Sequence, residues 1–494
     1  MAANKLTLWT GLGLVISNMV GTGVLTTAGA MSPELSAVQL LTAWVLGGIV
    51  ALGGALAYAA LARQVPRSGG EYRYLSSLLH PAVGYVAGWA SLLVGFSVPV
   101  AMAAHAAGDY FETVIPGVPP KLVATASIVS ITFLHALNFG ASKWTQDVLA
   151  TVKALLFIGF IVVGLSAGSH TLPQPSADAA PSGEFPIYAF FASMVPVMYC
   201  YSGWNAAIYA SEEFAQPRRD VPRAMIIGCL LVTALYVLIN AIIVMNLSHD
   251  EVVQFRTTDP QRITLAHVVM QNLLGRGTAT VMSAFVVLSL LAAISAMTLI
   301  GPRVYAAMAR DRLLPAVLGA TSGKPPLGSV IAQGAIAIAL VYLTTFRTLL
   351  DNVGAILAII SAVTVLSLLR RSRWRSGERP GIAALLGAVV FSSMSTAMVY
   401  SAMKSSPKVP VLGVAIPTVM LWIIGIVAIS LIGFLVTRVF RPDAGRQRRR
   451  RRDDPESADF TDRRGGRRSR DDETALPKAS VVVDQRQGDR SDDR

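Results

Sequence analysis

The residues of this chain best suited to chemistry lie inside long apolar stretches. Lys153 is the one lysine placed well inside such a stretch, TQDVLATVKALLFIGFIVVG. Two further stretches combine small and polar residues, NMVGTGVLTTAG at 18–29 and YSGWN at 201–205. Both combinations weaken a helix, because Gly adds backbone freedom and hydroxyl groups compete for backbone partners. These three places are the candidates for a site.

The first Gly-containing stretch predicts an unwound turn rather than a packing face. Gly21 and Gly23 are two residues apart, so they would face different sides of a helix, and Thr22 between them can compete for the backbone. At membrane depth, unwound backbone is tolerated only where it is buried in protein or lines a cavity. A helix N-terminus there attracts an anion, and freed carbonyls accept from an ammonium group. A zwitterion, which carries one anionic and one ammonium group, fits both parts of such a site.

The second stretch lies where a symmetric partner of the first is expected. It follows Pro196 and reads Ser202-Gly203-Trp204-Asn205, in the sixth apolar segment. Inverted-repeat membrane proteins interrupt corresponding helices of their two halves. Interruptions in the first and sixth segments therefore predict a five-plus-five repeat.

The position of Lys153 inside an apolar segment is unfavourable in free energy. A charged side chain at the centre of a membrane span costs about 2.5–3.5 kcal/mol and normally marks a pathway or relay. A lysine can lower this cost by losing its proton. Two interpretations stay open: a charged brace between helices, or a group that takes part in proton coupling.

Other site chemistry has no support in the sequence. The histidines show no spacing with Cys or carboxylates typical of a metal site, so no metal or other cofactor is expected. Cys200 and Cys229 lie in apolar segments and are expected to pack as small apolar residues. No Ser/His/Asp or Cys/His set can be assembled near either interruption, so we do not expect an enzyme.

The composition of the chain indicates whether its surface faces water or lipid. Of 494 residues, 53% are hydrophobic and 14% are charged. A water-soluble chain carries about 25% charged residues. We therefore expect an all-α integral membrane protein, with spans of about 20 apolar residues each.

Twelve segments satisfy that length. They lie near 10–31, 37–61, 82–108, 121–139, 145–167, 186–210, 224–246, 277–309, 327–346, 349–369, 381–402 and 411–437. An even number places both termini on one side. The alternate loops that include the N-terminus hold more than twice the Lys and Arg of the others, so this side is expected to be cytoplasmic.

These segments give the expected domain organisation. Residues 1–9 form a cytoplasmic N-terminus and 10–438 the twelve-helix domain, with one repeat at 10–167, a second at 186–369 and two extra helices at 381–437. Residues 439–494 are expected to be a disordered cytoplasmic tail. Its basic cluster at 448–452 either binds anionic lipid headgroups or stays solvated and reinforces topology. Acidic residues interrupt every basic cluster, so no nucleic acid is expected as a partner.

Four motifs resemble the amino acid–polyamine–organocation superfamily, whose members have the LeuT-type fold. They are VGTGVLT at 20–26, PRSGGEYRYL at 66–75, YSGWNAAIYASEEFAQPRRDVPRA at 201–224 and GPRVYAAMARDRLLP at 301–315. The resemblance covers residues 1 to about 438 and is closest to the L-type and cationic amino acid transporter branch. It implies a permease of the cytoplasmic membrane, and high Arg and Ala beside little Lys favours a bacterial source.

The resemblance also implies roles for individual residues. Backbone N–H groups of Gly21, Thr22 and Gly23 would take a substrate carboxylate, and the carbonyls of Met19, Val20 and Tyr199 its ammonium. Tyr199 would gate the site or only pack there. Ser202 and Gly203 would let the helix open. Asn205 would bond the substrate, cap the helix or join two helices, and Lys153 would replace the sodium ion of sodium-coupled relatives.

Together these features predict a secondary-active transporter that moves amino acids by alternating access, independent of sodium and coupled to protons. Helices 1, 2, 6 and 7 would rock against helices 3, 4, 8 and 9. Apart from Glu212 and Glu213, we expect no acidic residue near the interruptions, which favours neutral L-amino acids. The alternatives are an exchanger without net ion coupling and a substrate-binding sensor that signals through the tail. The sequence names no partner protein.

Overall fold

The computed structural model describes residues 5–21, 23–27, 35–137, 139–169, 187–247, 251, 265–319, 326–370, 379–411 and 414–439. The chain divides into two units, Met1–Thr437 and Arg438–Arg494. Almost all described residues belong to the first unit. Thr22 and the expected tail from residue 440 onward lie outside the described residues.

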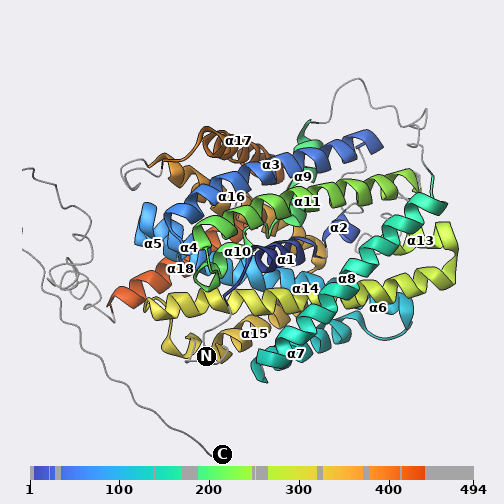
Figure 1. Cartoon of the computed structure of the whole chain (residues 1–494), viewed down its shortest axis with the longest axis horizontal. Coiled ribbons are helices and arrows are strands. Elements are labelled where there is room, and N and C mark those ends of the chain that lie inside the picture. Colours follow the sequence, from blue (N-terminus) through green and yellow to red (C-terminus); the bar gives the residue numbers. More distant parts are fainter. Residues whose placement is uncertain are drawn as a thin grey trace, which may run out of the picture. The chain divides into compact units, whose positions relative to one another are not determined.

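The first unit is built almost wholly from helices (Figure 1). In chain order its elements are α1 Leu8–Met19, α2 Gly23–Thr26, α3 Ala37–Gln64, α4 Gly70–Leu78, α5 Pro81–Ala90, the π-helix η2 Ser91–Ser97, α6 Val98–Val114, α7 Pro120–Leu137, α8 Phe139–Ala167, α9 Ile187–Tyr201, α10 Ala206–Tyr209, η4 Ser211–Glu213, α11 Pro217–Met245, α13 Leu265–Leu274, α14 Arg276–Arg310, η5 Ala316–Leu318, α15 Leu327–Leu343, α16 Phe346–Leu366, η6 Ser367–Leu369, α17 Ile382–Ser405, β1 Lys408–Val411, β2 Val414–Pro417 and α18 Thr418–Val439.

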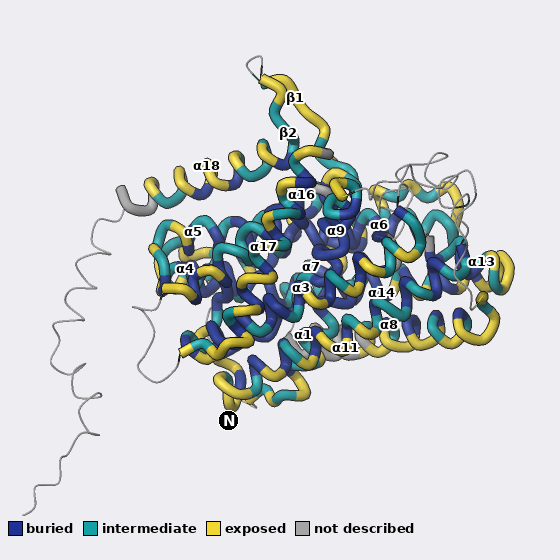
Figure 2. The backbone as a smooth tube through the Cα atoms, turned by 90° about the horizontal axis from the view of Figure 1, so that it is seen from above, coloured by how far each residue is buried: buried dark blue, intermediate teal, exposed yellow. Residues whose placement is uncertain are grey.

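Many of these helices are long and apolar enough to cross a membrane. Within the described residues, seven helical stretches meet that standard, and five shorter apolar helices accompany them, α1, α9 and α15 among them. Exposed residues line the outer faces of the helices (Figure 2), and many of them are large and apolar. On α8, Leu155, Ile158 and Val162 are each at least 58% exposed. A surface of this kind is stable against lipid tails and not against water. The chain is a multi-pass membrane protein.

The helices pack as two groups. In the first, α11 packs against both α1 and α3, and α3 also contacts α9. In the second, α14 packs along α6, and α7 contacts α6 and α15. Helix α8 contacts both groups, through α14 and α11. In chain order, the first group holds the first, second, sixth and seventh apolar segments, and the second group holds the third, fourth, eighth and ninth.

The third long apolar stretch contains a π-helix. Residues Ser91–Ser97 adopt it between α5 and α6, and Pro99 follows. Proline has no N–H and clashes with the preceding turn of an α-helix, so a widened turn before it is favourable. The hydroxyl of Ser97 donates to the carbonyl of Leu92 at 2.7 Å, within this widened turn. Such turns in a helix often lie at functional sites.

Helix α17 is held against α3 by two glycines. A Cβ atom at Gly53 would lie 2.9 Å from the carbonyl oxygen of Gly387, and one at Gly387 would be equally crowded by Gly53. The two backbones therefore touch, which is the small-residue packing typical of membrane helices. This contact joins the penultimate helix of the domain to the first packing group.

The expectation of an all-α chain is wrong in one place. Residues 408–417 form an antiparallel pair, β1 and β2, with Lys408 opposite Pro417. The last helix therefore begins at Thr418 and not near 411. Pro407, Pro410 and Pro417 disfavour a helix here, and the valines between them favour extended backbone.

Candidate functional site

The first helix is interrupted where its glycines predict. Helix α1 ends at Met19, Val20 has non-helical torsion angles, and α2 begins at Gly23. The N–H of Gly21 turns back and donates to the carbonyl of Met19 at 2.7 Å. The carbonyls of Ser17 and Val20 lie at this end of α1, beside the turn.

Side chains from two other helices satisfy the freed carbonyls. Lys153 of α8 donates through Nζ to the carbonyl of Val20 at 2.7 Å and to that of Ser17 at 3.3 Å. Tyr236 of α11 places its hydroxyl 2.5 Å from the carbonyl oxygen of Met19. Lys153 is 4% exposed, and its amino group faces the C-terminal end of α1, where the helix dipole is negative. Lys153 thus joins α8 to the first interruption.

The second interruption separates α9 from α10. Residues 202–205 form turns, and Gly203 has φ +100°. A side chain there would be strained, and its Cβ would lie 2.7 Å from Nδ2 of Asn18. The carbonyl of Tyr199 accepts from the hydroxyl of Ser202 at 2.6 Å and from its N–H at 3.0 Å. Residues within the second interruption therefore supply hydrogen bonds to its own backbone.

The two interruptions contact each other directly. Nδ2 of Asn18 donates to the carbonyl of Gly203 at 3.3 Å. A Cβ at Gly23 would overlap the sulfur of Cys200, so only glycine fits this approach. The hydroxyl of Tyr236 also lies 3.1 Å from the carbonyl oxygen of Cys200. Side chains and close backbone packing hold the two non-helical segments together.

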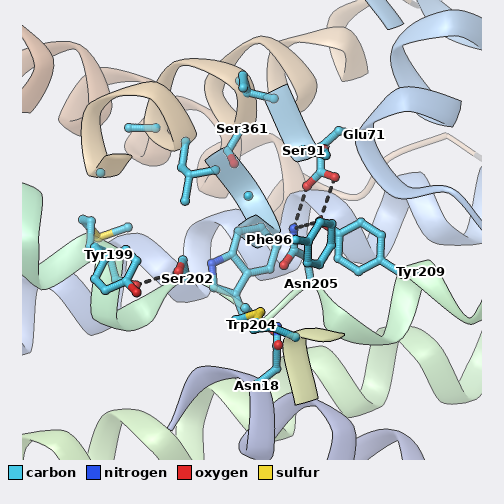
Figure 3. Close-up of a pocket in the computed structure, with 18 of the residues that line it drawn as sticks. Asn18, Glu71, Ser91, Phe96, Tyr199, Ser202, Trp204, Asn205, Tyr209 and Ser361 are labelled. Atoms are coloured by element: carbon cyan, nitrogen blue, oxygen red, sulfur yellow. Dashed lines mark hydrogen bonds between the residues drawn. The ribbon is translucent and has the colours of Figure 1, made fainter. Parts of the chain in front are cut away.

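Two cavities of unequal size lie beside this junction. Both are lined by Asn18, Tyr199, Ser202 and Met297. The smaller one is next to the first interruption, and the larger one extends past the second to the π-helix of residues 91–97 (Figure 3). Because they share these four lining residues, the two cavities are adjacent.

Most of the residues proposed from the sequence line these cavities. The smaller cavity includes Met19, Gly21, Gly23, Tyr199 and Ser202, and the larger one includes Tyr199, Ser202, Gly203 and Asn205. Val20 and Lys153 line neither, because they bond each other behind the first interruption. Trp204 lines the larger cavity and packs edge-on against Tyr58, with ring centroids 4.6 Å apart.

The expectation that only Glu212 and Glu213 lie near the interruptions is wrong. Glu71 of α4 is 4% exposed and lines the larger cavity. It was missed because it lies far from either interruption in sequence, within the motif PRSGGEYRYL at 66–75. A carboxylate directly after two glycines was the available signal: Gly70 has φ +58° and makes room for the ring of Tyr209.

Three neutral donors converge on Glu71, and two of them, Asn205 and Tyr209, are drawn in Figure 3. Oε1 accepts from Nδ2 of Asn205 at 2.6 Å and from the hydroxyl of Tyr58 at 3.1 Å, and Oε2 accepts from the hydroxyl of Tyr209 at 2.9 Å. Burial raises the pKa of the neighbouring phenol of Tyr74 on α4, and the charge of Glu71 adds to that shift. The carboxylate thereby ties α4 to α10.

Glu212 and Glu213 lie outside the cavities and make surface ion pairs. Arg303 of α14 pairs with Glu213 at 2.9 Å, and Arg310 pairs with Glu212 at 3.4 Å. The N-terminal segment joins them, since the N–H of Leu6 donates to the carbonyl of Glu213 at 2.8 Å. These contacts connect the loop after α10 with α14, which belongs to the second packing group.

Known proteins with similar sequences identify the family of this chain. Residues 6–395 match the family model described as "Amino acid permease". The chain is 25% identical over 420 residues to the large neutral amino acids transporter small subunit 2 of Mus musculus, covering 82% of this chain and 77% of that protein. It is 29% identical over 311 residues to the serine/threonine exchanger SteT of Bacillus subtilis (strain 168), covering 62% and 68%.

A third relative matches a shorter region. The b(0,+)-type amino acid transporter 1 of Homo sapiens is 27% identical over 243 residues, which is 48% of this chain and 50% of that protein. The family model spans well over half of the chain, with both interruptions, Lys153 and Glu71 inside the match. The chain belongs to the amino acid permease family of the amino acid–polyamine–organocation superfamily and is a membrane transporter, not an enzyme.

Proposed function

We propose that this protein is a secondary-active transporter that carries amino acids across the membrane by alternating access. The observation that supports this most strongly is the junction of two interrupted helices beside two cavities. Backbone groups released at membrane depth are tolerated where they line such a cavity, and there they can serve as ligands for a zwitterion.

The proposed architecture has twelve spans in a five-plus-five inverted repeat of the LeuT type, with both termini in the cytoplasm. The seven long apolar stretches and the five shorter ones add up to this number within the described residues. In this arrangement α1 with α2, and α9 with α10, are the corresponding interrupted helices. The group of α1, α3, α9 and α11 would move against α6, α7, α14 and α15.

The substrate carboxylate is proposed to lie at the first interruption, on the N–H groups of Gly21, Thr22 and Gly23. The N–H of Gly21 would then exchange its bond to the carbonyl of Met19 for one to the substrate. The carbonyls expected to take the ammonium are also engaged, by Lys153, Tyr236 and Ser202. Tyr199, Ser202, Gly203 and Asn205 would form the remaining contacts.

Neutral L-amino acids remain the proposed substrates, now for a different reason. Two of the relatives are named for large neutral amino acids and for serine and threonine. The larger cavity has apolar walls, with Phe96, Met297, Leu357 and Phe391 among them. Such walls suit an uncharged side chain, and three donors already bond the carboxylate of Glu71.

Lys153 supports transport without sodium. Its ammonium lies where carbonyl oxygens converge at the end of α1, and it can supply there the charge that a bound cation would. Proton coupling requires that this group, or another in the site, exchange a proton during the cycle. The alternative is an exchanger in which Lys153 is only a brace, and the name of the bacterial relative favours it.

Uptake into proteoliposomes tests this proposal. Labelled amino acids are supplied with and without an inward proton gradient, to the parent protein and to Lys153→Ala. Gradient-driven accumulation that is lost in the variant, while exchange persists, identifies coupling through Lys153. No response to the gradient, with exchange in the parent, identifies the exchanger. Absence of uptake and exchange for the whole panel would overturn the proposed function.

A further inference from the structure

Glu71 is a buried carboxylate without a basic partner. It is 4% exposed, and within the described residues no ion pair joins it to a lysine, arginine or histidine. Arg73, two residues further along α4, pairs instead with Asp311 at 2.7 Å. A buried charge without a counter-charge is unfavourable, and binding a proton removes the charge. Glu71 is therefore suited to take up and release a proton.

The side chains that face Glu71 from α3, α4 and α10 are neutral. Tyr58 and Asn205 donate to Oε1, and Tyr209 donates to Oε2. Burial raises the pKa of Tyr74 on α4, and the charge of Glu71 raises it further, so this phenol stays protonated. Neutral donors stabilise the ionised carboxylate without cancelling its charge.

The other elements near α4 add no charge to this wall of the larger cavity. Helix α16 contributes the hydroxyl of Ser361, and η2 contributes that of Ser91. Tyr85 of α5 packs against Phe434 of α18, and two arginines of α14 pair with glutamates outside the cavity. Among the described residues that line the larger cavity, Glu71 is the one carboxylic acid, and none is a lysine, arginine or histidine.

The position of Glu71 makes it accessible to a proton. Glu71 lines the larger cavity, and Figure 3 shows its carboxylate bonded to Asn205 and Tyr209 there. Lys153 lines neither cavity, and its amino group is turned toward the carbonyl of Val20. In the proposed topology the loop between α3 and α4 is cytoplasmic, so Glu71 lies at the cytoplasmic end of the cavity.

Tyr209 can change its hydrogen bond when Glu71 binds a proton. Its hydroxyl now donates to Oε2 of Glu71 and accepts from Nδ2 of Asn205 at 3.0 Å. A hydroxyl has one donor hydrogen and two acceptor lone pairs. When a hydronium ion in the cavity gives its proton to Oε2 and becomes water, the new O–H can donate to the phenol oxygen. The phenol hydrogen then turns toward the cavity, and loss of the proton to water reverses both changes.

We infer that Glu71 carries the proton that moves with the substrate, and that its protonation loosens the link between α4 and α10. This inference rests on the proposed function and names the coupling group within it. Hydrogen bonds to an ionised carboxylate are about twice as strong as those between neutral groups. Protonation therefore weakens the bonds that hold Asn205 and Tyr209, and the second interruption is freer to move. Lys153 then serves as the brace of the first interruption.

The first experiment compares the full-length parent with Glu71→Gln in proteoliposomes. Glutamine has the shape of a protonated glutamic acid and releases no proton. With one proton per substrate, an inward gradient of one pH unit should drive about 10-fold accumulation of the labelled amino acid in the parent. Glu71→Gln should show no such accumulation, while exchange of labelled for unlabelled amino acid persists. Accumulation driven by the gradient in Glu71→Gln would overturn the inference.

Two further variants separate proton carriage from stability. Glu71→Asp again has a carboxyl group and should regain accumulation. Glu112→Gln, at the end of α6 and lining neither cavity, is the matched control and should accumulate substrate like the parent. If Glu71 only stabilises the protein, Glu71→Gln will lower the melting temperature and will reduce exchange and accumulation together. That result would refute the role of Glu71 as proton carrier.

Tyr209→Phe tests the change of hydrogen bond. The variant removes a donor to the ionised form of Glu71, so the carboxyl should bind its proton more readily. With equal pH on both sides of the membrane, the midpoint of the pH profile of uptake should rise by about one pH unit. Tyr188→Phe, at an exposed tyrosine of α9, should leave the midpoint unchanged. An unchanged midpoint in Tyr209→Phe would refute the part assigned to Tyr209.

The parent alone distinguishes failure of this inference from failure of the proposed function. A parent that exchanges amino acids but does not respond to the proton gradient would overturn the inference and leave an amino acid carrier. A parent that neither accumulates nor exchanges any amino acid would refute the proposed function itself.

Discussion

The two helix interruptions are stabilised in different ways. At the first, the freed carbonyls of Ser17, Met19 and Val20 are bonded by Lys153 and Tyr236, which come from other helices. At the second, Ser202 bonds the carbonyl of its own turn. The first interruption depends on neighbours distant in sequence, whereas the second is largely satisfied locally.

This difference indicates distinct roles. Neighbours on α8 and α11 hold the backbone of the first interruption. The second is joined to the first through Asn18 and to α4 through Glu71, and its own turn supplies further bonds. Changes at the first interruption should therefore affect stability most.

The largest effect is expected from Lys153→Met. The variant leaves the carbonyls of Ser17 and Val20 without the donor that now bonds them, at a cost of about 2–5 kcal/mol in the free energy of unfolding. Thermal unfolding of the purified protein measures the loss. Lys121→Met is the control, because Lys121 is exposed at the start of α7, and it should unfold like the parent. A melting temperature equal to the parent's in Lys153→Met would show that the first interruption does not depend on α8.

The next effect is expected from Gly203→Ala. The new side chain must adopt φ +100° and would crowd Asn18, at a cost of about 1–3 kcal/mol. Uptake should fall about 10-fold or more, because the turn between α9 and α10 must shift. Gly159→Ala on α8 has no atom near the added methyl group and serves as the comparison. Normal uptake by Gly203→Ala would mean that the second interruption tolerates another backbone conformation.

A smaller effect is expected from Tyr236→Phe. The hydroxyl lies near carbonyls of both interruptions, and its loss should cost about 0.5–1.5 kcal/mol. Uptake kinetics should show up to about a 10-fold loss in affinity. Tyr400→Phe, at an exposed tyrosine of α17, gives the baseline for removing a hydroxyl. An effect no larger than that baseline would argue against Tyr236 as a link between the interruptions.

The smallest effect is expected from Arg310→Gln. Its ion pair with Glu212 is 3.4 Å long, and the side chains are 62% and 41% exposed. Exposed pairs contribute about 0–1 kcal/mol and weaken with salt. Uptake should change less than about threefold, and the difference should shrink in high salt. A loss of uptake as large as that of Gly203→Ala would show that this surface pair is as important for uptake as the interruptions.

Local sequence was enough to predict where the helices are interrupted. Gly21 and Gly23, and the run from Ser202 to Asn205, weaken a helix through properties of the residues themselves. The position of Lys153 in an apolar segment likewise marked it as a candidate site residue, and the structure places it against the first interruption. Each of these signals is carried by neighbouring residues in the chain.

The residues that were missed depend on tertiary contacts. Glu71 reaches Asn205 across 134 positions, and Tyr236 reaches Met19 across 217. No periodicity or local spacing in the sequence indicates a contact between residues so far apart in the chain. The π-helix of residues 91–97 was also missed, since Pro99 marks only a local disturbance and does not specify its form. The β1–β2 pair was missed because its valines also fit the apolar run of the last helix.

The contact between Gly53 and Gly387 makes this protein suited to fluorescence measurements of motion. Because α17 touches α3 backbone to backbone, a dye on the outer face of α17 is carried with α3. Leu386 is 61% exposed on α17 and Leu122 is 59% exposed on α7, so cysteines at these positions would accept a donor and an acceptor dye. The two native cysteines are buried, so background labelling should be low. The efficiency of energy transfer between the dyes would then report changes in the distance between the two packing groups as substrate is added.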